Sequence, residues 1–211
     1  MRTKLLLLVF SAVLVISAAA IAVEAPFPYT LSAGKNLVAM PAVPLNPDPA
    51  AVFDGIPIEG VLIRWDAATQ SSRAYDEWDP DYFGNVLIGE GYWITTASGA
   101  SSSYQGLTDT DSMDIWISLP KAGRNLIGNP FSYEYTWGDA KVTDGNETIS
   151  LEQARDRGWL NSVALWWDAS AGSSRDVGLT DDWCYTDVLY PWHGYWVTSN
   201  IDKIALILEA P

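Results

Sequence analysis

The segment Gly91-Tyr92-Trp93-Ile94-Thr95 returns almost unchanged as Gly194-Tyr195-Trp196-Val197-Thr198. Each occurrence lies near the end of one half of the chain. An echo of this length that contains a tryptophan is improbable by chance, and internal self-similarity is the sequence signature of repeat architectures. The pair therefore predicts that the chain is a tandem duplication, around which the other segments can be aligned.

The segments before this motif repeat in the same order. Gly34-Lys35-Asn36-Leu37-Val38-Ala39-Met40-Pro41 corresponds to Gly123-Arg124-Asn125-Leu126-Ile127-Gly128-Asn129-Pro130. In the middle of each half, Ile63-Arg64-Trp65-Asp66-Ala67 corresponds to Leu165-Trp166-Trp167-Asp168-Ala169. Short apolar runs bounded by Gly and Pro are typical of strands joined by tight turns.

One short helix is expected in each copy. In the first copy, Asp48 can cap a helix that has Pro49 at its first position. In the second copy, Ser150-Leu151-Glu152-Gln153 forms a capping box, and a hairpin turning at Asp144-Gly145 precedes it. The fold class predicted is mainly β: two internally duplicated antiparallel β modules, sandwich-like, each with one short helix and packed together.

Residues 1–22 have the three parts of a secretory signal peptide: a basic start, an apolar run and a small-residue exit. The Ala20-Ile21-Ala22 pattern favours cleavage over an uncleaved membrane anchor, and no other segment approaches the length of a membrane span. The domain organisation expected is a signal peptide over 1–22, a first β module over 23–111 and a second over 112–211.

The chain is strongly acidic, with a formal net charge of −14. Cleavage would remove Arg2 and Lys4 and no acid, which changes the net charge to −16. Such a charge repels phosphate backbones, so a nucleic-acid partner is not expected. Cys184 is the only cysteine, so no intramolecular disulfide can form. Stability must come from a core for which 11 Trp and 10 Tyr supply ample apolar area.

The pattern Gly-x-Asn-Leu-(Ile/Val)-x-x-Pro followed by Gly-Tyr-Trp-(Ile/Val) resembles a repeat module common in secreted and surface proteins of bacteria. The second copy is the closer match, and the resemblance covers nearly all of the chain after residue 22. Lys35 and Arg124 depart from the pattern, since members of this family usually have an aromatic there. The resemblance implies an extracellular β module that accompanies other domains, and it brings no catalytic residues.

Alternation along a strand separates core side chains from outward ones. In Ile63-Arg64-Trp65 the charged Arg64 is expected to point to solvent, so Trp65 and its counterpart Trp167 are expected to point inward. Trp166 takes the place of Arg64 and is therefore predicted to point outward.

The repeated Gly-Tyr-Trp strand divides in the same way. Tyr92 and Tyr195 belong to its apolar face, whereas Trp93 and Trp196 lie on the opposite face with polar residues. Trp116 is also predicted to point outward, because its neighbours Ile115 and Ile117 form the apolar face of that strand.

Trp93, Trp116, Trp166 and Trp196 are therefore the candidate binding residues. One interpretation is that these tryptophans pack beneath the helix or the other copy, since burial alone is a sufficient reason for them. The other is a binding surface, because flat indoles stack on sugar rings and anchor protein partners. Large exposed apolar patches are rare on free monomers, which favours packing for each residue taken singly.

Catalytic and metal-binding patterns are weak. His193 is the only histidine, which excludes multi-histidine metal sites and histidine-paired nucleophiles, and it stands where the first copy has Glu90. Acid pairs such as Asp79-Pro80-Asp81 and Asp181-Asp182 could serve a glycosidase only if they were paired in space. The acidic run 109–114 lacks the Gly and the Glu of a calcium loop.

The function expected is that of a secreted or cell-surface protein that is not an enzyme, with neither cofactor nor metal. It would bind a carbohydrate or a surface protein through outward aromatic residues. The alternative is a structural subunit that assembles with copies of itself at the cell surface. A carboxylate-based glycoside hydrolase is a third hypothesis, although nothing in the sequence selects an acid pair.

Overall fold

The computed structural model describes residues 23–179 and 183–211. The predicted signal peptide and the acids Asp181 and Asp182 lie outside the described residues. Within the described part, no helix has both the length and the apolar character needed to cross a bilayer.

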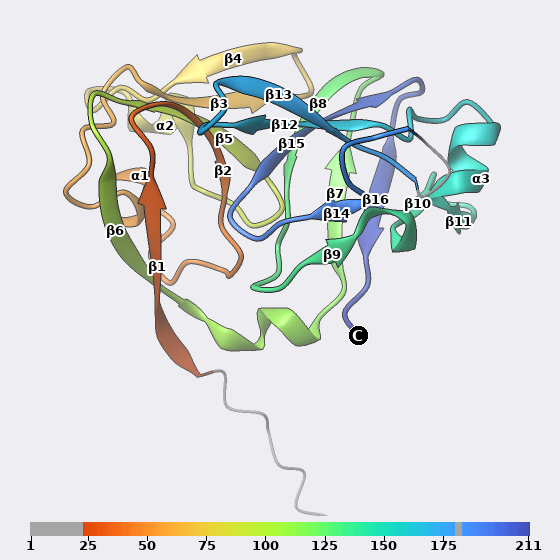
Figure 1. Ribbon diagram of the computed structural model, residues 1–211, viewed down its shortest axis with the longest axis horizontal. Coiled ribbons are helices and arrows are strands. Elements are labelled where there is room, and N and C mark those ends of the chain that lie inside the picture. The colour runs from red at the N-terminus through yellow and green to blue at the C-terminus, as the bar shows by residue number, and fades with distance from the viewer. Residues whose placement is uncertain (1–22, 180–182) are drawn as a thin grey trace, which may run out of the picture.

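The first half of the chain forms a four-stranded antiparallel sheet and a two-stranded ribbon (Figure 1). The sheet has the order β2-β5-β3-β4, and β1 pairs with β6 to form the ribbon. The strands of this half are β1 (Glu24–Leu31), β2 (Gly34–Ala39), β3 (Leu62–Asp66), β4 (Ser71–Ala74), β5 (Gly91–Thr96) and β6 (Ala100–Leu107). The helical turns are α1 (Pro49–Val52), α2 (Pro80–Phe83) and η1 (Thr108–Ser112).

The second half repeats this plan with additions. Its main sheet has the order β13-β12-β15-β8, a second sheet has the order β11-β10-β16-β7, and β9 pairs with β14. The strands are β7 (Ile115–Leu119), β8 (Gly123–Gly128), β9 (Tyr135–Thr136), β10 (Lys141–Thr143), β11 (Thr148–Ser150), β12 (Ala164–Asp168), β13 (Ser173–Val177), β14 (Val188–Leu189), β15 (Gly194–Ser199) and β16 (Ile204–Leu208). The helical turns are η2 (Trp137–Asp139) and α3 (Leu151–Asp156).

The strands of the two halves pair in the same register. Leu37 of β2 lies opposite Trp93 of β5, and Leu126 of β8 lies opposite Trp196 of β15. The ribbon β1–β6 corresponds to the pair β7–β16. All named strand pairs are antiparallel, so the predicted mainly β, sandwich-like fold is confirmed.

Each half has its own hydrophobic core. Tyr92 and Tyr195, the tyrosines of the repeated motif, are fully buried at the centre of these cores, as predicted. Their hydroxyl groups play the same role in both halves. The backbone N–H of Leu87 donates to Tyr92 Oη at 2.7 Å, and that of Tyr190 donates to Tyr195 Oη at 2.6 Å. Each tyrosine thus fixes the loop that leads into its own strand.

Local sequence signals correctly predicted α1, α3 and the added hairpin. The Asp48 carboxylate accepts from the backbone N–H of Ala50 at the start of α1, and Ser150 and Gln153 form the predicted capping box of α3. The predicted hairpin is β10–β11. Helix α2 was not predicted; it is a single turn that begins at Pro80, so the first half has two short helices rather than one.

The two halves meet where their repeated glycines cross. A Cβ added to Gly194 would lie 3.2 Å from the Cα of Gly91, and one added to Gly91 would lie 2.7 Å from the carbonyl oxygen of Ile127. The contact is reciprocal: Ala39 N donates to Trp192 O at 3.1 Å, and Gly128 N donates to Gly89 O at 2.9 Å. Only glycine allows the backbones to approach this closely. The halves are therefore packed together through their backbones.

Candidate functional site

The structure reverses the predicted orientation of side chains on β3 and β12. Arg64 lies opposite Tyr92 in the β3–β5 pair, so it shares the inner face with that buried ring. Its guanidinium is neutralised there, because Arg64 Nη2 lies 2.9 Å from Glu90 Oε1 and Nη1 donates to Phe83 O at 3.1 Å. The prediction that a charged residue must point to solvent was wrong, because a paired arginine can occupy an inner face.

Trp166 lies on the inner face of β12, as Arg64 does on β3, so the prediction that it points outward was also wrong. Its ring packs against the core of the second half and lies edge-on to the His193 ring, with centroids 5.0 Å apart. The indole N–H of Trp166 is buried and has no hydrogen-bond partner among residues 23–179 and 183–211. Trp166 with His193 thus occupies the place that Arg64 with Glu90 fills in the first half.

Trp65 and Trp167, predicted to point inward, lie instead between the two main sheets. The indole N–H of Trp65 donates to Arg124 O at 2.7 Å, and that of Trp167 donates to Lys35 O at 2.9 Å. Each hydrogen bond joins one half to the other. These bonds stabilise the outward orientation of Trp65 on β3 and Trp167 on β12.

The candidate residues Trp93 and Trp196 join this arrangement. The Trp93 ring lies 5.8 Å from Trp167, and the Trp196 ring lies 5.2 Å from Trp65. Both are on the outward face, as predicted, and both are half-buried because the other half covers them. Trp116 also points outward on β7 and is 62% exposed, away from the other three candidates.

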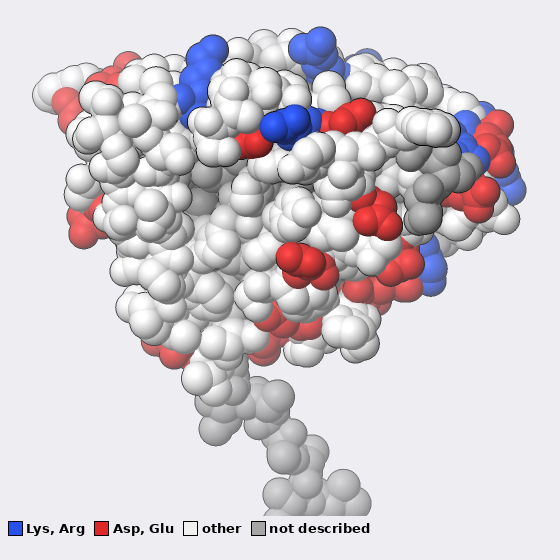
Figure 2. All heavy atoms as spheres, viewed as in Figure 1, with Lys and Arg blue, Asp and Glu red and all other residues white. Residues whose placement is uncertain are grey.

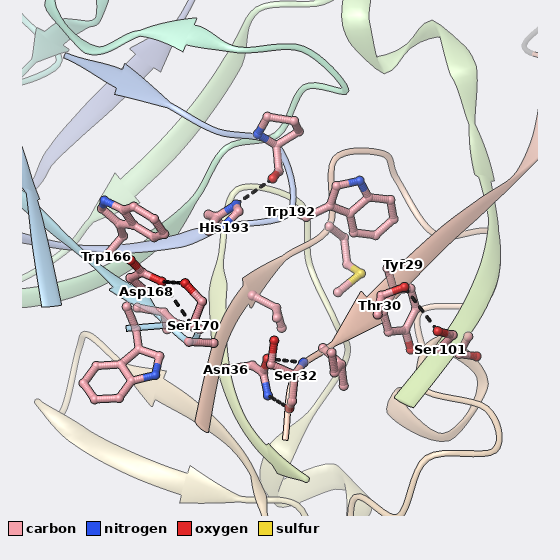
Figure 3. Close-up of a pocket in the computed structure, with 18 of the residues that line it drawn as sticks. Tyr29, Thr30, Ser32, Asn36, Ser101, Trp166, Asp168, Ser170, Trp192 and His193 are labelled. Carbon is pink, nitrogen blue, oxygen red and sulfur yellow. Dashed lines mark hydrogen bonds between the residues drawn. The ribbon is translucent and has the colours of Figure 1, made fainter. Parts of the chain in front are cut away.

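A hollow with a volume of about 720 Å³ lies between the halves. Figure 3 shows it bounded by β1 and β2 of the first half and by the β12 turn and the loop before β15 of the second. Trp166 and His193 lie on one side of this hollow, and Tyr29 and Trp192 lie on the other (Figure 3). We call this hollow the interface pocket.

A smaller counterpart of the interface pocket lies at the corresponding place in the other half. Its volume is about 260 Å³, and its lining includes Arg64, Trp65, Asp66 and Glu90. These residues correspond in the alignment to Trp166, Trp167, Asp168 and His193. The Arg64–Glu90 ion pair thus lines the smaller hollow, and the Trp166–His193 aromatic pair lines the larger one.

Trp192 is the most unusual residue of the interface pocket. It has φ = 67°, a left-handed backbone conformation that side chains rarely adopt, and its counterpart in the first half is Gly89 with φ = 77°. The indole packs against Tyr29 and Tyr104, with ring centroids 5.6 and 6.0 Å away. A non-glycine residue in this conformation costs about 1–2 kcal/mol, and such residues cluster at binding and catalytic sites.

His193 is held as a neutral ring. Burial lowers its pKa, while the Pro191 carbonyl and the charge of Asp168 act in the opposite direction. Nδ1 lies 2.8 Å from Pro191 O, so Nδ1 carries the proton and donates to that carbonyl. The neutral ring leaves Nε2 as a hydrogen-bond acceptor.

Short polar side chains complete the lining of the interface pocket. The hydroxyls of Thr30 and Ser101 lie 3.2 Å apart, and the Asn36 side chain is tied to the backbone of Ser32. Among the described residues, Asp168 is the only carboxylate in the lining. The Ser170 hydroxyl, the backbone N–H of Ala171 and the guanidinium of Arg175 lower the pKa of Asp168, so it stays ionised.

Other sequence candidates lie outside this pocket. Asp79 and Asp81 are exposed at the surface, and Cys184 is half-buried. Within 23–179 and 183–211, no three His, Cys, Asp or Glu side chains come together in a way that could hold a metal ion. Of the four candidate tryptophans, Trp93 and Trp196 line the space between the sheets, and Trp166 lines both that space and the interface pocket.

Sequence reasoning missed Trp192 and Tyr29. The alignment of the halves holds a signal for Trp192, because it stands opposite Gly89 at the position before a matched strand. Tyr29 could not be found, since it aligns with the ordinary core residue Ile117 and becomes part of the pocket only through contact between halves.

Comparison with protein-family models, with curated proteins and with solved structures finds no match to this chain. The resemblance to bacterial surface repeat modules therefore rests on the quoted motifs alone.

Proposed function

We propose that this protein is a non-enzymatic binding module of duplicated β architecture that takes an uncharged carbohydrate into the interface pocket. The observation that carries the proposal is Trp192, which keeps a bulky ring at a left-handed position where the first half has glycine. Strained residues of this kind cluster at binding and catalytic sites, and Trp192 is the one in the described lining of this pocket. The signal peptide predicted for residues 1–22 would place this module outside the cytoplasm, secreted or at the cell surface.

The lining of the pocket favours a sugar over other ligands. Aromatic walls suit the apolar faces of sugar rings, and the hydroxyls of Thr30, Ser32, Ser101 and Ser170 suit sugar hydroxyls. The described lining contains no lysine or arginine, so an anionic ligand would find no counter-charge in it. The surface over β1 and β2, beside the pocket, carries few charged side chains (Figure 2). The ligand class supported best is therefore a neutral glycan.

The same residues argue against glycoside hydrolysis. A glycosidase needs two carboxyl groups across the scissile bond, one of them protonated. Asp168 is alone in the lining, and its lowered pKa makes it a poor proton donor. The role that Asp168 can perform is that of a fixed hydrogen-bond acceptor.

Affinity electrophoresis in gels that contain soluble polysaccharides tests this proposal. We expect retardation by one class of neutral glycan, such as a glucan, mannan, xylan or galactan, and none by uronate or sulfated polymers. Trp116→Ala is the matched control, because Trp116 is exposed on β7 outside the pocket, and it should be retarded like the wild type. Free migration in every neutral glycan would contradict the proposal.

A further inference from the structure

The outward faces of the two main sheets form a second hollow, which we call the tryptophan groove. The tryptophans of these outward faces that line it are Trp65, Trp93, Trp167 and Trp196, and Trp166 of the inner face also borders the larger part. It has two connected parts of about 260 and 530 Å³, which share Lys35, Trp93 and Trp196 in their linings. The apolar side chains of Val163 and Leu165 extend the larger part and are 37% and 43% exposed.

Two cations at equivalent positions flank this groove. Lys35 lies opposite Thr95, and Arg124 lies opposite Thr198, each on the outward face of its sheet. Arg124 also lies over the Trp196 ring, with Cζ 5.9 Å from the ring centroid.

Lys35 and Arg124 are unlike most of the other basic residues that the structure describes. Neither is within ion-pair distance of a carboxylate in the described residues, whereas Lys203 adjoins Asp202. The remaining described cations form ion pairs: Arg64, Arg73, Lys121, Lys141, Arg155, Arg157 and Arg175. In a chain of net charge −14, the tryptophan groove thus holds two cations that no described carboxylate pairs.

A segment with the complementary chemistry projects from the same molecule. Trp78, in the loop between β4 and α2, is 87% exposed, and its neighbours are Asp76, Glu77, Asp79 and Asp81. The loop is held in shape, because Trp78 N donates to Asp76 Oδ1 at 2.9 Å and Glu77 N donates to Glu59 Oε2 at 2.8 Å. An indole displayed on a fixed loop loses little conformational entropy on binding. We call residues 76–81 the acidic loop.

We propose that the tryptophan groove of one molecule receives Trp78 and the acidic loop of a second copy. The indole would lie among the groove tryptophans, and the loop carboxylates would meet Lys35 and Arg124. Tryptophan and arginine are the residue types that most often dominate binding energy at interfaces. Because groove and loop are different surfaces, the contact is head-to-tail, and each molecule can both give a loop and accept one.

The net charge of each molecule opposes this contact only at long range. At physiological ionic strength, repulsion between exposed charges is screened beyond about 8 Å, whereas partly buried pairs are screened much less. Association is therefore expected near physiological salt and at high protein concentration. This inference does not depend on carbohydrate binding at the interface pocket, and the two can fail separately.

Analytical ultracentrifugation over a wide concentration range tests the inference. The weight-average mass of the wild type should rise with concentration, past that of a dimer. Trp78→Ala, which removes the inserted ring, and the double variant Lys35→Glu/Arg124→Glu, which reverses the groove charge, should each stay monomeric. Trp116→Ala, which removes a different exposed tryptophan, should associate like the wild type.

Mixing the two defective variants is the decisive step. Trp78→Ala keeps an intact groove, and the charge-reversed variant keeps an intact acidic loop, so the mixture should form one-to-one dimers and nothing larger. A wild type that stays monomeric, or a mixture that stays monomeric, would overturn the inference. Association of Trp78→Ala to the wild-type extent would do the same, since another surface would then be responsible.

Discussion

Gly128→Ala is expected to lower the free energy of unfolding by about 3 kcal/mol or more, near the upper end for overpacking substitutions. A Cβ at this position would overlap the Cβ of Ala39 and lie 2.8 Å from the carbonyl oxygen of Glu90. The second obstacle is backbone from the other half, which cannot move without separating β5 from β8. For a chain of this size, the melting temperature should fall by about 6–12 °C.

Two further variants make this test specific. In Gly138→Ala, the new Cβ would lie 3.6 Å from its nearest neighbour, an ordinary contact, so stability should change by less than about 0.5 kcal/mol. Adding Ala39→Gly to Gly128→Ala removes one obstacle and leaves Glu90 O, so it should recover part of the loss. Chemical denaturation measures all three. Wild-type stability in Gly128→Ala would show that the halves do not cross as described.

Trp166→Arg is expected to destabilise the protein by about 3–5 kcal/mol. The substitution removes a half-buried indole that packs against the core. It leaves a guanidinium on the inner face of β12 beside neutral His193, which stands in the place of Glu90. An arginine is tolerated at the equivalent position 64 because the carboxylate of Glu90 lies 2.9 Å from the Arg64 guanidinium. The cost therefore comes from the missing partner rather than from arginine itself.

Adding His193→Glu to Trp166→Arg supplies that partner and copies the first half into the second. We expect a favourable coupling of about 1–3 kcal/mol between the two substitutions, within the range found for side chains in direct contact. A double-mutant cycle by chemical denaturation measures it. Strictly additive losses would mean that positions 166 and 193 do not interact. That result would contradict the correspondence between the Arg64–Glu90 ion pair of the first half and the Trp166–His193 pair of the second.

Repetition and local signals were enough to predict the fold class. The matched Gly-Tyr-Trp segments located β5 and β15 correctly, and alternation placed Tyr92 and Tyr195 in the cores. The capping box and the Asp144-Gly145 turn were correct because each depends on neighbours within a few residues. Helix α2 escaped notice because its single turn lies within an acidic stretch with no apolar period.

The site was less predictable because side-chain direction on β3 and β12 depends on residues far away in the sequence. Arg64 points inward because Glu90 is there to pair with it, and Trp65 points outward because Arg124 O accepts its N–H. A rule that places every charged side chain in solvent takes no account of Glu90 or of the Arg124 carbonyl. Trp166 therefore lines the pocket from the inner face of β12, although it was predicted to lie on the outer face. Trp192 was overlooked because it lies in a turn, where side chains do not alternate between two faces.

Calorimetric titration of Trp192→Gly with the retarded glycan tests most directly whether the interface pocket is the binding site. Glycine relieves the left-handed strain of about 1–2 kcal/mol, which offsets part of the lost indole packing, so the variant should stay folded. We expect its binding heat to disappear while that of Trp116→Ala stays at the wild-type level. Undiminished binding by folded Trp192→Gly would contradict the assignment of the pocket.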